Sequence, residues 1–533
     1  MKCYFAPLAL CLLAMVCMLA VPSHLVKKVE AVCPTCPPPP PPPPTVGQFG
    51  GPLAGLSTTI TNLFNGGYGT FVIKWDPIRG LGPVSTKTGC FTCHGAGTDV
   101  LTGTAGDTSN VTGTRYGKWN SDNTFNYLDG NGTFPENEGG PIVHGISNAT
   151  FQTLPGCNQM TIASNGATES GTTVTITTTA AHGFQKGQEV QVLNVPVSGY
   201  NGQFAIVSIP STTTFTYTAT KSGLAASGGG AAQNLPHEVV PADATVVSNV
   251  RSPQLFGFGL IDNIPDASIT ANVGISKKYG ITGIANMVSD ENGVIRPGKF
   301  GQKLDAVSLF QFNANAEFNE LGITTNNSLF GVSTEFNPSE HLPQGLSFPN
   351  NCQPDKNSPQ DVAQVNMIKM TQFEALLAPL PPKAPTSQTT AGEAVFASTG
   401  CNICHIESFT TQQNVTLRTT NGKTSAVIPS LSNVTFSPYS DFLLHDMGSG
   451  DSGGIPFQPH GTGQATLTMW RTAPLWGLSN ILAKSGGLMH DNSQTTIDKA
   501  IRHHGGEAAT VVSNYEALSS TDSANLLAFL GSL

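Results

Sequence analysis

Alternating apolar and polar positions mark one stretch of the chain, residues 160–232. Apolar side chains two positions apart recur there, at Val174/Ile176, Val190/Val192, Phe204/Ile206 and Phe215/Tyr217. Short turns such as Tyr200-Asn201-Gly202 separate these pairs, and a period of two with short turns is typical of antiparallel strands. The pattern predicts a small all-β module inserted in the chain.

The last third of the chain has a helical pattern instead. Residues 390–396 run as a helix towards Cys401, and Gly392 would let a second helix cross closely. At the C-terminus, the capping signal at Ser519/Ser520 precedes an apolar face made of Leu526, Phe529, Leu530 and Leu533. Two helices thus flank the segment that begins at Cys401. We therefore expect a mainly α protein with long loops, plus the β module.

The N-terminus carries an apolar run from about Phe5 to Val21, with small residues after it. This pattern predicts a signal peptide at residues 1–31, removed on export. An uncleaved membrane anchor is the alternative, although the run is short for a hydrocarbon core of ~30 Å. We expect a periplasmic protein, or one secreted to the cell surface.

A linker rich in Cys and Pro follows at residues 32–48. It contains eight consecutive prolines, Pro37 to Pro44, which form a spacer of polyproline II type or a ligand for a proline-binding groove.

Only 11% of the 533 residues are charged and the net charge is −9, so we expect no nucleic-acid partner. A chain of this length forms two or three domains.

Two cysteine motifs carry the strongest chemical signal: Cys90-Phe91-Thr92-Cys93-His94 and Cys401-Asn402-Ile403-Cys404-His405. In a CxxCH motif, two thiols add to the vinyl groups of one haem and the histidine binds its iron. Two such motifs in an exported chain predict two covalent haem c groups, with His94 and His405 as iron ligands. Two helices around one such site resemble the plan of a small cytochrome c, so we expect two cytochrome c-like lobes. Zinc binding or chance is the alternative.

Four cysteines remain outside the haem motifs and the signal peptide, namely Cys33, Cys36, Cys157 and Cys352. They could form two disulfides in an oxidising compartment, and the sequence leaves all three pairings open. Cys157 with Cys352 is the pairing that we prefer.

A short internal sequence repeat, which we call the echo, accompanies the two CxxCH motifs. The segment from Arg251 to Gly257 parallels the segment from Arg471 to Gly477, and each follows one CxxCH motif. Two related haem lobes explain the echo. Each arginine could hold a haem propionate, and a surface role is the alternative.

Eight ordered stretches carry a further resemblance: GLGP at 80–83, TGTRYG at 112–117, ENEGGP at 136–141, LFGFGLID at 255–262, EFNELGIT at 317–324, YSDFLLHDMG at 439–448, WRTAPLWG at 470–477 and HGGEA at 504–508. They resemble the di-haem oxidoreductase family, also called thiol oxidoreductases or di-haem peroxidases, which is distantly similar to bacterial di-haem cytochrome c peroxidases. The resemblance implies an oxidoreductase and covers residues 65–533 except the β module.

The resemblance also implies ligands for the second iron. In the peroxidases, a segment of the form His-Asp-Gly…Ala-Val-x-x-x-Gly delivers the distal ligand just before its last glycine. The match of this segment at residues 489–505 assigns that role to His504, with His503 as a competitor and His445 or Met447 next. The family's His-Asp-Gly-Arg is His490-Asp491-Asn492-Ser493 here, which puts the geometry of this loop in doubt.

The first haem has no obvious distal ligand. His237 is the nearest histidine before Arg251 and His144 the next, so this haem is open or held by one of them. Glu138, with Glu136 beside it, is our candidate for the acid/base that moves a proton between peroxide oxygens, and an exposed loop carboxylate is the alternative.

These predictions divide the chain into a signal peptide (1–31), a linker (32–48), a first haem lobe (49–159 and 233–385) interrupted by the β module (160–232), and a C-terminal haem lobe (386–533). We expect an oxidoreductase that passes electrons between two haems to a small oxidant such as hydrogen peroxide, or exchanges them with a redox partner protein. A non-catalytic electron carrier is the rival. The β module resembles β-rich repeats of bacterial and phage surface proteins, which implies a surface partner, and calcium between the lobes is left open.

Overall fold

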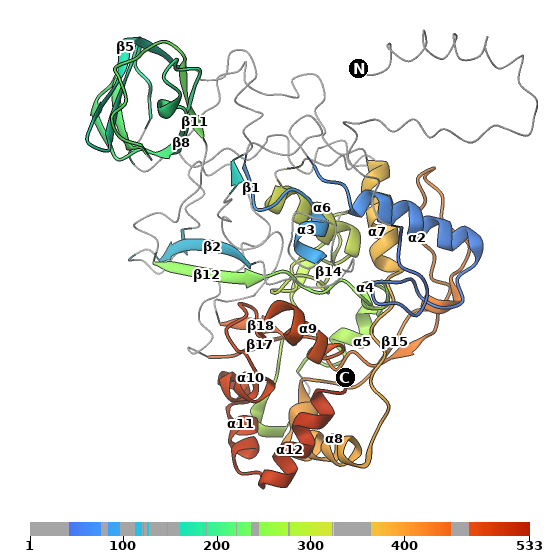
Figure 1. The fold of residues 1–533 in the computed structure, drawn as a ribbon. Helices are drawn as coiled ribbons and strands as arrows, with labels where there is room; N and C mark the ends of the chain where they lie inside the picture. The colour runs from blue at the N-terminus through green and yellow to red at the C-terminus, as the bar shows by residue number, and fades with distance from the viewer. Residues whose placement is uncertain are drawn as a thin grey trace, which may run out of the picture. The chain divides into compact units, whose positions relative to one another are not determined.

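The computed structural model describes residues 42–75, 84–95, 112–119, 121, 125–126, 146–147, 160–184, 186, 189–219, 221–235, 245–274, 278–290, 292–321, 323, 364–448 and 468–533. Helices make up 33% of this described part and strands 22% (Figure 1). These fractions are those of an ordinary mixed α and β protein. The expectation of a mainly α protein with two cytochrome c-like lobes was therefore wrong.

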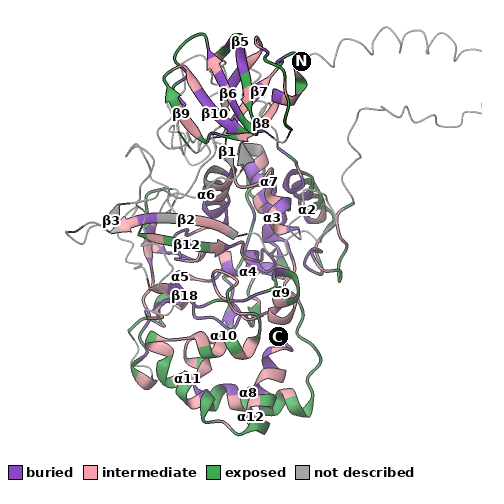
Figure 2. Cartoon of the chain, turned by 60° about the vertical axis from the view of Figure 1, so that its left-hand side comes forward, coloured by how far each residue is buried: buried purple, intermediate pink, exposed green. Residues whose placement is uncertain are grey.

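The largest sheet overturns that expectation most directly. Seven antiparallel strands form it in the order β8-β7-β11-β5-β6-β10-β9. Their bounds are Met160–Ser170 (β5), Thr173–Thr178 (β6), Glu189–Leu193 (β7), Gly202–Ala205 (β8), Ser208–Ser211 (β9), Thr214–Thr218 (β10) and Ala231–Leu235 (β11). The alternation predicted strands here, and Val174, Ile176, Phe215 and Tyr217 are fully buried in a hydrophobic cluster that this sheet encloses by itself (Figure 2).

A second sheet joins the chain segments on either side of this seven-stranded sheet. Strand β2 (Thr112–Trp119) pairs antiparallel with β12 (Val246–Arg251), from Gly117 opposite Val246 to Thr112 opposite Arg251. A short strand, β3 (Phe125–Asn126), extends the sheet. The seven strands are therefore an excursion of the chain between two paired strands, and β12 ends at Arg251.

The remaining elements build the part of the protein that carries the CxxCH motifs. Its α-helices are α2 (Thr58–Phe71), α3 (Cys90–His94), α4 (Phe258–Asp262), α5 (Asp266–Thr270), α6 (Leu309–Leu321), α7 (Gln364–Ala375), α8 (Ser387–Thr399), α9 (Leu478–Ser485), α10 (Ile497–His503), α11 (Ala509–Glu516) and α12 (Ser520–Leu530). Its short strands form four two-stranded pairs: β1 (Val84–Ser85) with β4 (Ile146–Ser147), β13 (Met287–Ser289) with β14 (Ile295–Pro297), β15 (Phe409–Thr410) with β16 (Thr435–Phe436), and β17 (Leu444–Asp446) with β18 (Met469–Arg471). One large hydrophobic cluster contains buried residues from α2 to α10 in chain order, and α8, α11 and α12 contribute to a separate, smaller one.

Two helix pairs pack through glycines. Helix α8, which precedes the second motif, crosses α12 where a Cβ on Gly392 would come within 2.0 Å of the Asn525 carbonyl oxygen. Helix α2, before the first motif, crosses α7 at Gly67, where a Cβ would lie 2.1 Å from the Lys369 carbonyl oxygen. The packing role predicted for Gly392 is confirmed, and each CxxCH motif follows a helix of the same kind.

The C-terminal helix has the predicted cap. The Ser519 hydroxyl accepts a hydrogen bond from the backbone N–H of Asp522. Leu526, Phe529 and Leu530 are buried against Phe396 of α8 in a smaller cluster. The apolar face predicted from the sequence is therefore the face that packs against α8.

The two echo segments pack on each other. Gly257 and Gly477 both have positive φ, 77° and 67°, and each begins a helix, α4 or α9. A Cβ on Gly257 would meet the Trp476 ring at 2.6 Å, and one on Gly477 would meet the Phe256 ring at 2.9 Å. The glycine of each segment therefore packs against the aromatic ring of the other segment. The contact is reciprocal, as expected for two segments related by an approximate twofold axis.

Within the described ranges, the longest apolar helices fall short of what a membrane crossing requires. The apolar run at residues 5–21 lies outside those ranges.

Candidate functional site

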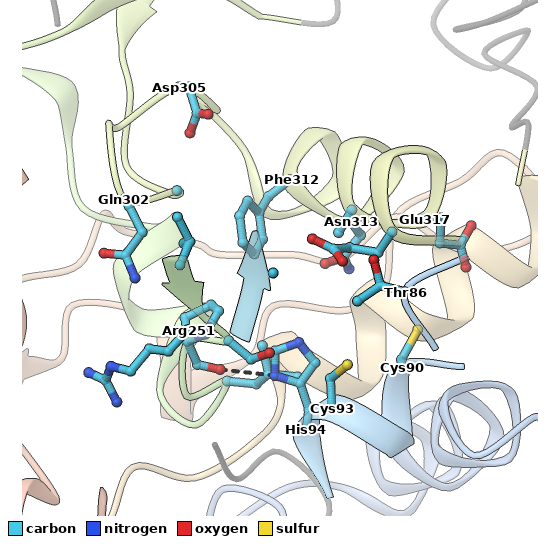
Figure 3. Close-up of a pocket in the computed structure, with 18 of the residues that line it drawn as sticks. Thr86, Cys90, Cys93, His94, Arg251, Gln302, Asp305, Phe312, Asn313 and Glu317 are labelled. Carbon is cyan, nitrogen blue, oxygen red and sulfur yellow. Dashed lines mark hydrogen bonds between the residues drawn. The ribbon is translucent and has the colours of Figure 1, made fainter. Parts of the chain in front are cut away.

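The first CxxCH motif lines a cavity, which we call the first cavity. Helix α3 carries Cys90, Cys93 and His94 on one side, and α6 faces it with Phe312 and Asn313 (Figure 3). The empty space amounts to about 1290 Å³, its open mouth included.

The second CxxCH motif lines another cavity, the second cavity, with about 1570 Å³ of empty space including its mouth. Cys401, Cys404 and His405 contribute to its wall together with residues of β17, α9, α10 and the loop after α10. The structure thus gives each motif its own cavity.

Both motif histidines are held in the same way. The Nδ1 of His94 is 2.9 Å from the Pro253 carbonyl oxygen, and that of His405 is 2.8 Å from the Tyr439 carbonyl oxygen. An acceptor at Nδ1 fixes the proton there and leaves Nε2 with its lone pair for a metal. Burial also lowers the pKa of each ring to about 4, so both imidazoles are neutral at physiological pH. Each histidine is therefore prepared to be a metal ligand.

Three of the four motif cysteines do not have the surroundings of metal-binding thiolates, whereas Cys404 lies with Asp441 and His445 in a group whose ligand atoms are close enough to hold a metal ion. Burial raises the pKa of Cys93 and of Cys401 to about 12, and that of Cys90 well above its ordinary value. Only the deprotonated thiolate binds metal, so burial disfavours zinc at these positions. An alkylated sulfur carries no charge and fits them.

Two arginines lie in the wall between the cavities. Arg251 and Arg471 each line both cavities, and burial lowers the pKa of each to about 10. The Arg251 Nε donates to the Met489 carbonyl oxygen at 2.8 Å. The Arg251 Nη1 and the Arg471 Nε are buried and have no hydrogen-bond partner among the described residues. Buried donors of this kind call for an anion, and haem propionates would supply one.

Trp470 shares this wall. It lines both cavities, and its indole stacks on the His490 ring at 3.7 Å between centroids with 16° between planes. The Lys303 ammonium lies 3.7 Å from the indole centroid and also donates to the Met469 carbonyl oxygen. A rigid aromatic group thus separates the two spaces.

His504, the predicted ligand of the second iron, lies in the wall of the second cavity. It follows the last residue of α10, and its Nδ1 is 2.7 Å from the Ala500 carbonyl oxygen. A metal would therefore meet its Nε2. Of the competitors, His445 and Met447 also line this cavity, whereas the His503 Nδ1 is 3.3 Å from the Gln494 side chain.

A buried cluster of Asp441, His445 and Glu507 lies against Cys404, and the sequence did not single it out. The His445 Nε2 is 3.0 Å from Asp441 Oδ2, and its Nδ1 is 2.9 Å from Glu507 Oε2. Asp441 is 0% exposed and His445 3% exposed. A neutral imidazole has one N–H, so two carboxylate partners require the charged form. The backbone N–H groups of Thr282 and Gly283 complete the shell of Glu507.

The cluster should make stability depend on pH. Burial opposes the charge of His445, but the hydrogen bonds that its ring makes to Asp441, Cys404 and Glu507 outweigh it and raise the His445 pKa from 6.5 to about 11. Burial likewise opposes the charge of Glu507, yet His445 and the backbone N–H groups lower its pKa from 4.5 to about 2. The His445 contribution is complete below pH ~6.5 and fades as pH rises towards its folded pKa, while the Glu507 contribution is complete above pH ~4.5 and fades on acidification.

We therefore expect the cluster to stabilise the fold most between pH ~4.5 and ~6.5. Urea unfolding of the wild type and of His445→Gln at about pH 5.5 and about pH 9 measures this. The stability difference between the two proteins should be larger at the lower pH. An equal or smaller difference there would mean that His445 is not charged in the fold.

Three carboxylates that line the first cavity were not predicted from the sequence to have a chemical role: Glu317, Glu320 and Glu374. Burial raises the pKa of Glu374 to about 8, and its Oε2 has no hydrogen-bond partner among the described residues. The sequence pattern could have indicated two of them, because Asn313, Glu317 and Glu320 are spaced by three or four residues and so share one face of a helix. Without the contact between α6 and α7, nothing in the sequence links Glu374 to that face.

Several predicted residues lie outside the described ranges. They are the acid/base candidate Glu138 with Glu136, the ligand candidates His144 and His237, and the disulfide candidates Cys33, Cys36, Cys157 and Cys352. Those predictions stay predictions.

Comparisons with known proteins point to one family. The family model described as "Di-haem oxidoreductase, putative peroxidase" matches residues 228–533, which is more than half of the chain and includes the second CxxCH motif. Among solved structures, hydrazine synthase of Kuenenia stuttgartiensis, pressurized with 20 bar xenon, is 14% identical over 53% of this chain and 89% of its own, with a TM-score of 0.22. A TM-score at that level supports no conclusion about fold or activity. The search of curated proteins finds no match.

Proposed function

From the premise that this chain belongs to the di-haem oxidoreductase family, we propose that it is an exported enzyme with two covalently attached haems, which passes electrons between them to reduce hydrogen peroxide. The balanced reaction takes one H₂O₂, two electrons and two protons to two molecules of water. A reduced partner protein supplies the electrons. The family gives the oxidoreductase class and the haem cofactor, and the finer parts of this proposal rest on the residues below.

One observation carries the proposal. Two cavities each hold a CxxCH motif whose histidine has its Nδ1 bonded to a backbone carbonyl, and the cavities share a wall. Two separate carriers would not need a common wall. An enzyme that moves electrons from one haem to the other does, since a shared wall keeps the two groups close.

The residues of the chain have distinct tasks in this proposal. The four motif cysteines would tether the haems, and His94 and His405 would bind the irons through Nε2. Arg251 and Arg471 would hold propionates with their buried donors, and His504 would be a further ligand of the second haem. When bound, the haems would supply one-electron chemistry that no side chain here provides.

The location and the partners are part of the proposal. The apolar N-terminal run supports export through a signal peptide, and covalent tethers suit a cofactor that must be retained outside the cytoplasm. The seven-stranded sheet has a hydrophobic core of its own, which supports a separate role such as docking at a surface partner. The net charge of −9 supports a protein or small-molecule partner rather than nucleic acid.

The haem count tests the proposal first. We expect the protein, produced in a host that attaches haem c, to contain two covalent haems per chain by intact mass and by pyridine haemochrome absorbance. The double variant Cys401→Ser with Cys404→Ser should contain one. Fewer than two covalent haems in the wild type contradicts the proposal.

Peroxide then separates an enzyme from a carrier. Protein reduced with ascorbate or dithionite should be reoxidised by hydrogen peroxide with a stoichiometry of one peroxide per two electrons. If peroxide leaves the reduced spectrum unchanged, the chain is an electron carrier and not a peroxidase.

A further inference from the structure

The loop after α10 carries His504 and is held at both of its ends. At its start, the His504 Nδ1 is 2.7 Å from the Ala500 carbonyl oxygen, one turn back in α10. At its end, Glu507 lies in a short 3-10 helix, η10 (Gly506–Ala508). Two glycines separate His504 from Glu507, and three residues of chain span at most about 11 Å. The place of Glu507 therefore limits where His504 can lie.

The Glu507 carboxylate is fixed by donors from two other segments of the chain. The backbone N–H groups of Thr282 and Gly283 donate to its Oε2 at 2.9 and 3.2 Å, and the His445 Nδ1 lies 2.9 Å from the same oxygen. The Asp446 N–H donates to Oε1 at 3.4 Å. Hydrogen bonds to an ionised carboxylate are among the strong ones in proteins, so Glu507 can anchor the loop that precedes it.

The glycines of the loop lie directly on the backbone of β17 and of the residue after it. A Cβ on Gly506 would come within 2.1 Å of the Asp446 carbonyl oxygen, and one on Gly505 within 2.8 Å of the Met447 carbonyl oxygen. Gly506 also has a φ of 52°, in the left-handed region that favours glycine. The loop is thus seated on β17 by its backbone as well as by the Glu507 side chain.

The same contacts keep His445 from acting as an iron ligand. Its Nδ1 faces Glu507 and its Nε2 faces Asp441, so a carboxylate oxygen occupies the lone-pair direction of each ring nitrogen. Gly283 covers the edge of the ring, where a Cβ would lie 2.7 Å from His445 Cε1. A histidine that ligates a metal needs one nitrogen for it. His504 instead has its Nδ1 on a backbone carbonyl, which is the arrangement of the two motif histidines.

We propose that Glu507 is a positioning residue, which fixes the loop on β17 and so holds His504 as a ligand of the haem at the second CxxCH motif. The two carboxylates around His445 keep its ring out of that role. This inference rests on the proposed function, because it needs a haem at this motif. It adds the residues that select His504 over His445 in the second cavity.

Removal of the anchor tests the inference. In the double variant Glu507→Ala with His445→Gln the loop loses its anchor, while the glutamine amide can still donate to Asp441 and has no imidazole to place on the iron. We expect the low-spin signal of the second haem to be lost from the electron paramagnetic resonance spectrum. The number of cyanide molecules bound per chain, followed in the Soret band, should rise by one, and added imidazole should restore the low-spin signal. A spectrum and a cyanide stoichiometry like those of the wild type overturn the inference.

A second variant moves the loop without altering any side chain of the cluster. Gly506→Ala places a Cβ against the Asp446 carbonyl oxygen and requires an alanine at positive φ, so it should displace the loop. Because the open form of the second haem becomes more populated, its apparent cyanide affinity should rise at least about tenfold. Cyanide binding that is unchanged from the wild type in Gly506→Ala counts against the inference as decisively as a silent double variant.

Leu526→Ala is the control for a general loss of stability. Leu526 is 0% exposed in the smaller hydrophobic cluster of α8, α11 and α12, so its truncation loosens the same half of the protein without touching the loop. The second haem should stay low-spin in this variant. If Leu526→Ala opens this haem as much as the double variant does, Glu507 has no positioning role.

His504→Ala separates failure of the inference from failure of the proposed function. This variant should show the same loss of low-spin signal as the double variant, because Glu507 acts through His504. Two covalent haems per chain with an unchanged low-spin signal in His504→Ala overturn the inference alone. Fewer than two covalent haems per chain in the wild type would instead overturn the proposed function.

Discussion

Replacement of Asp441 with Ala is expected to lower the free energy of unfolding by about 3–5 kcal/mol. Asp441 is 0% exposed and accepts from His445 Nε2 at 3.0 Å and from the Leu443 N–H at 3.0 Å. Removing one partner of a buried pair leaves the other charge in the interior without compensation, which is where the large cost comes from. Urea unfolding followed by circular dichroism measures the difference.

An exposed ion pair of the same half provides the control. The Arg502 Nη1 lies 3.0 Å from Glu516 Oε1, with side chains 45% and 53% exposed. Water screens such a pair, so Glu516→Ala should cost less than about 1 kcal/mol. If Asp441→Ala costs no more than Glu516→Ala, the cluster around His445 does not support the fold.

On the proposal that the chain binds two haems, replacement of Arg251 with Gln is expected to lower the reduction potentials of both haems together. A positive charge stabilises the reduced state of a nearby iron, so its removal disfavours reduction. For a charge roughly 10 Å away at an effective dielectric of about 20, the interaction is ~1.7 kcal/mol. This corresponds to a shift on the order of 70 mV for one electron. Because Arg251 lines both cavities, one substitution should move two potentials.

Spectroelectrochemical titration resolves the two potentials, and Arg502→Gln is the matched control. Arg502 lies on α10 of the second half, but its side chain is 45% exposed and pairs with Asp498 and Glu516. Its substitution should leave both potentials unchanged. A shift of only one haem in Arg251→Gln would mean that the arginine serves a single cavity, and unchanged potentials would remove it from both.

The sequence pattern predicted those elements whose structure depends on interactions between residues close together in the chain. The strands at Val174/Ile176 and Phe215/Tyr217 follow from alternation, and the last helix follows from its cap at Ser519 and its apolar face. The CxxCH motifs could also be recognised locally, because five adjacent residues carry each of them, and the role of His504 as an iron ligand stays a prediction. Each of these features can be recognised within about a dozen residues.

The fold class was mispredicted because it depends on how strands distant in the sequence pair. The segment at residues 112–119 has few apolar side chains and looks like a loop, but it becomes a strand when β12 pairs with it. Tertiary context of this kind overrides local propensity. The cluster of Asp441, His445 and Glu507 was missed for the same reason, since only the fold brings Glu507 to His445.

The first cavity is built from parts of the chain that are far apart. The Cys90 Sγ lies 3.5 Å from the Met370 Sδ, a contact between residues 280 positions apart, and β2 must wait for β12 to form its sheet. Contacts at such separations carry a large loop-closure cost and form slowly. Until α7 is in place, the segment that bears Cys90 and Cys93 has no enclosure, and its thiols remain accessible. Covalent haem attachment at this motif, as in the proposed function, would therefore precede folding, and the haem would serve as a nucleus around which the later segments collapse.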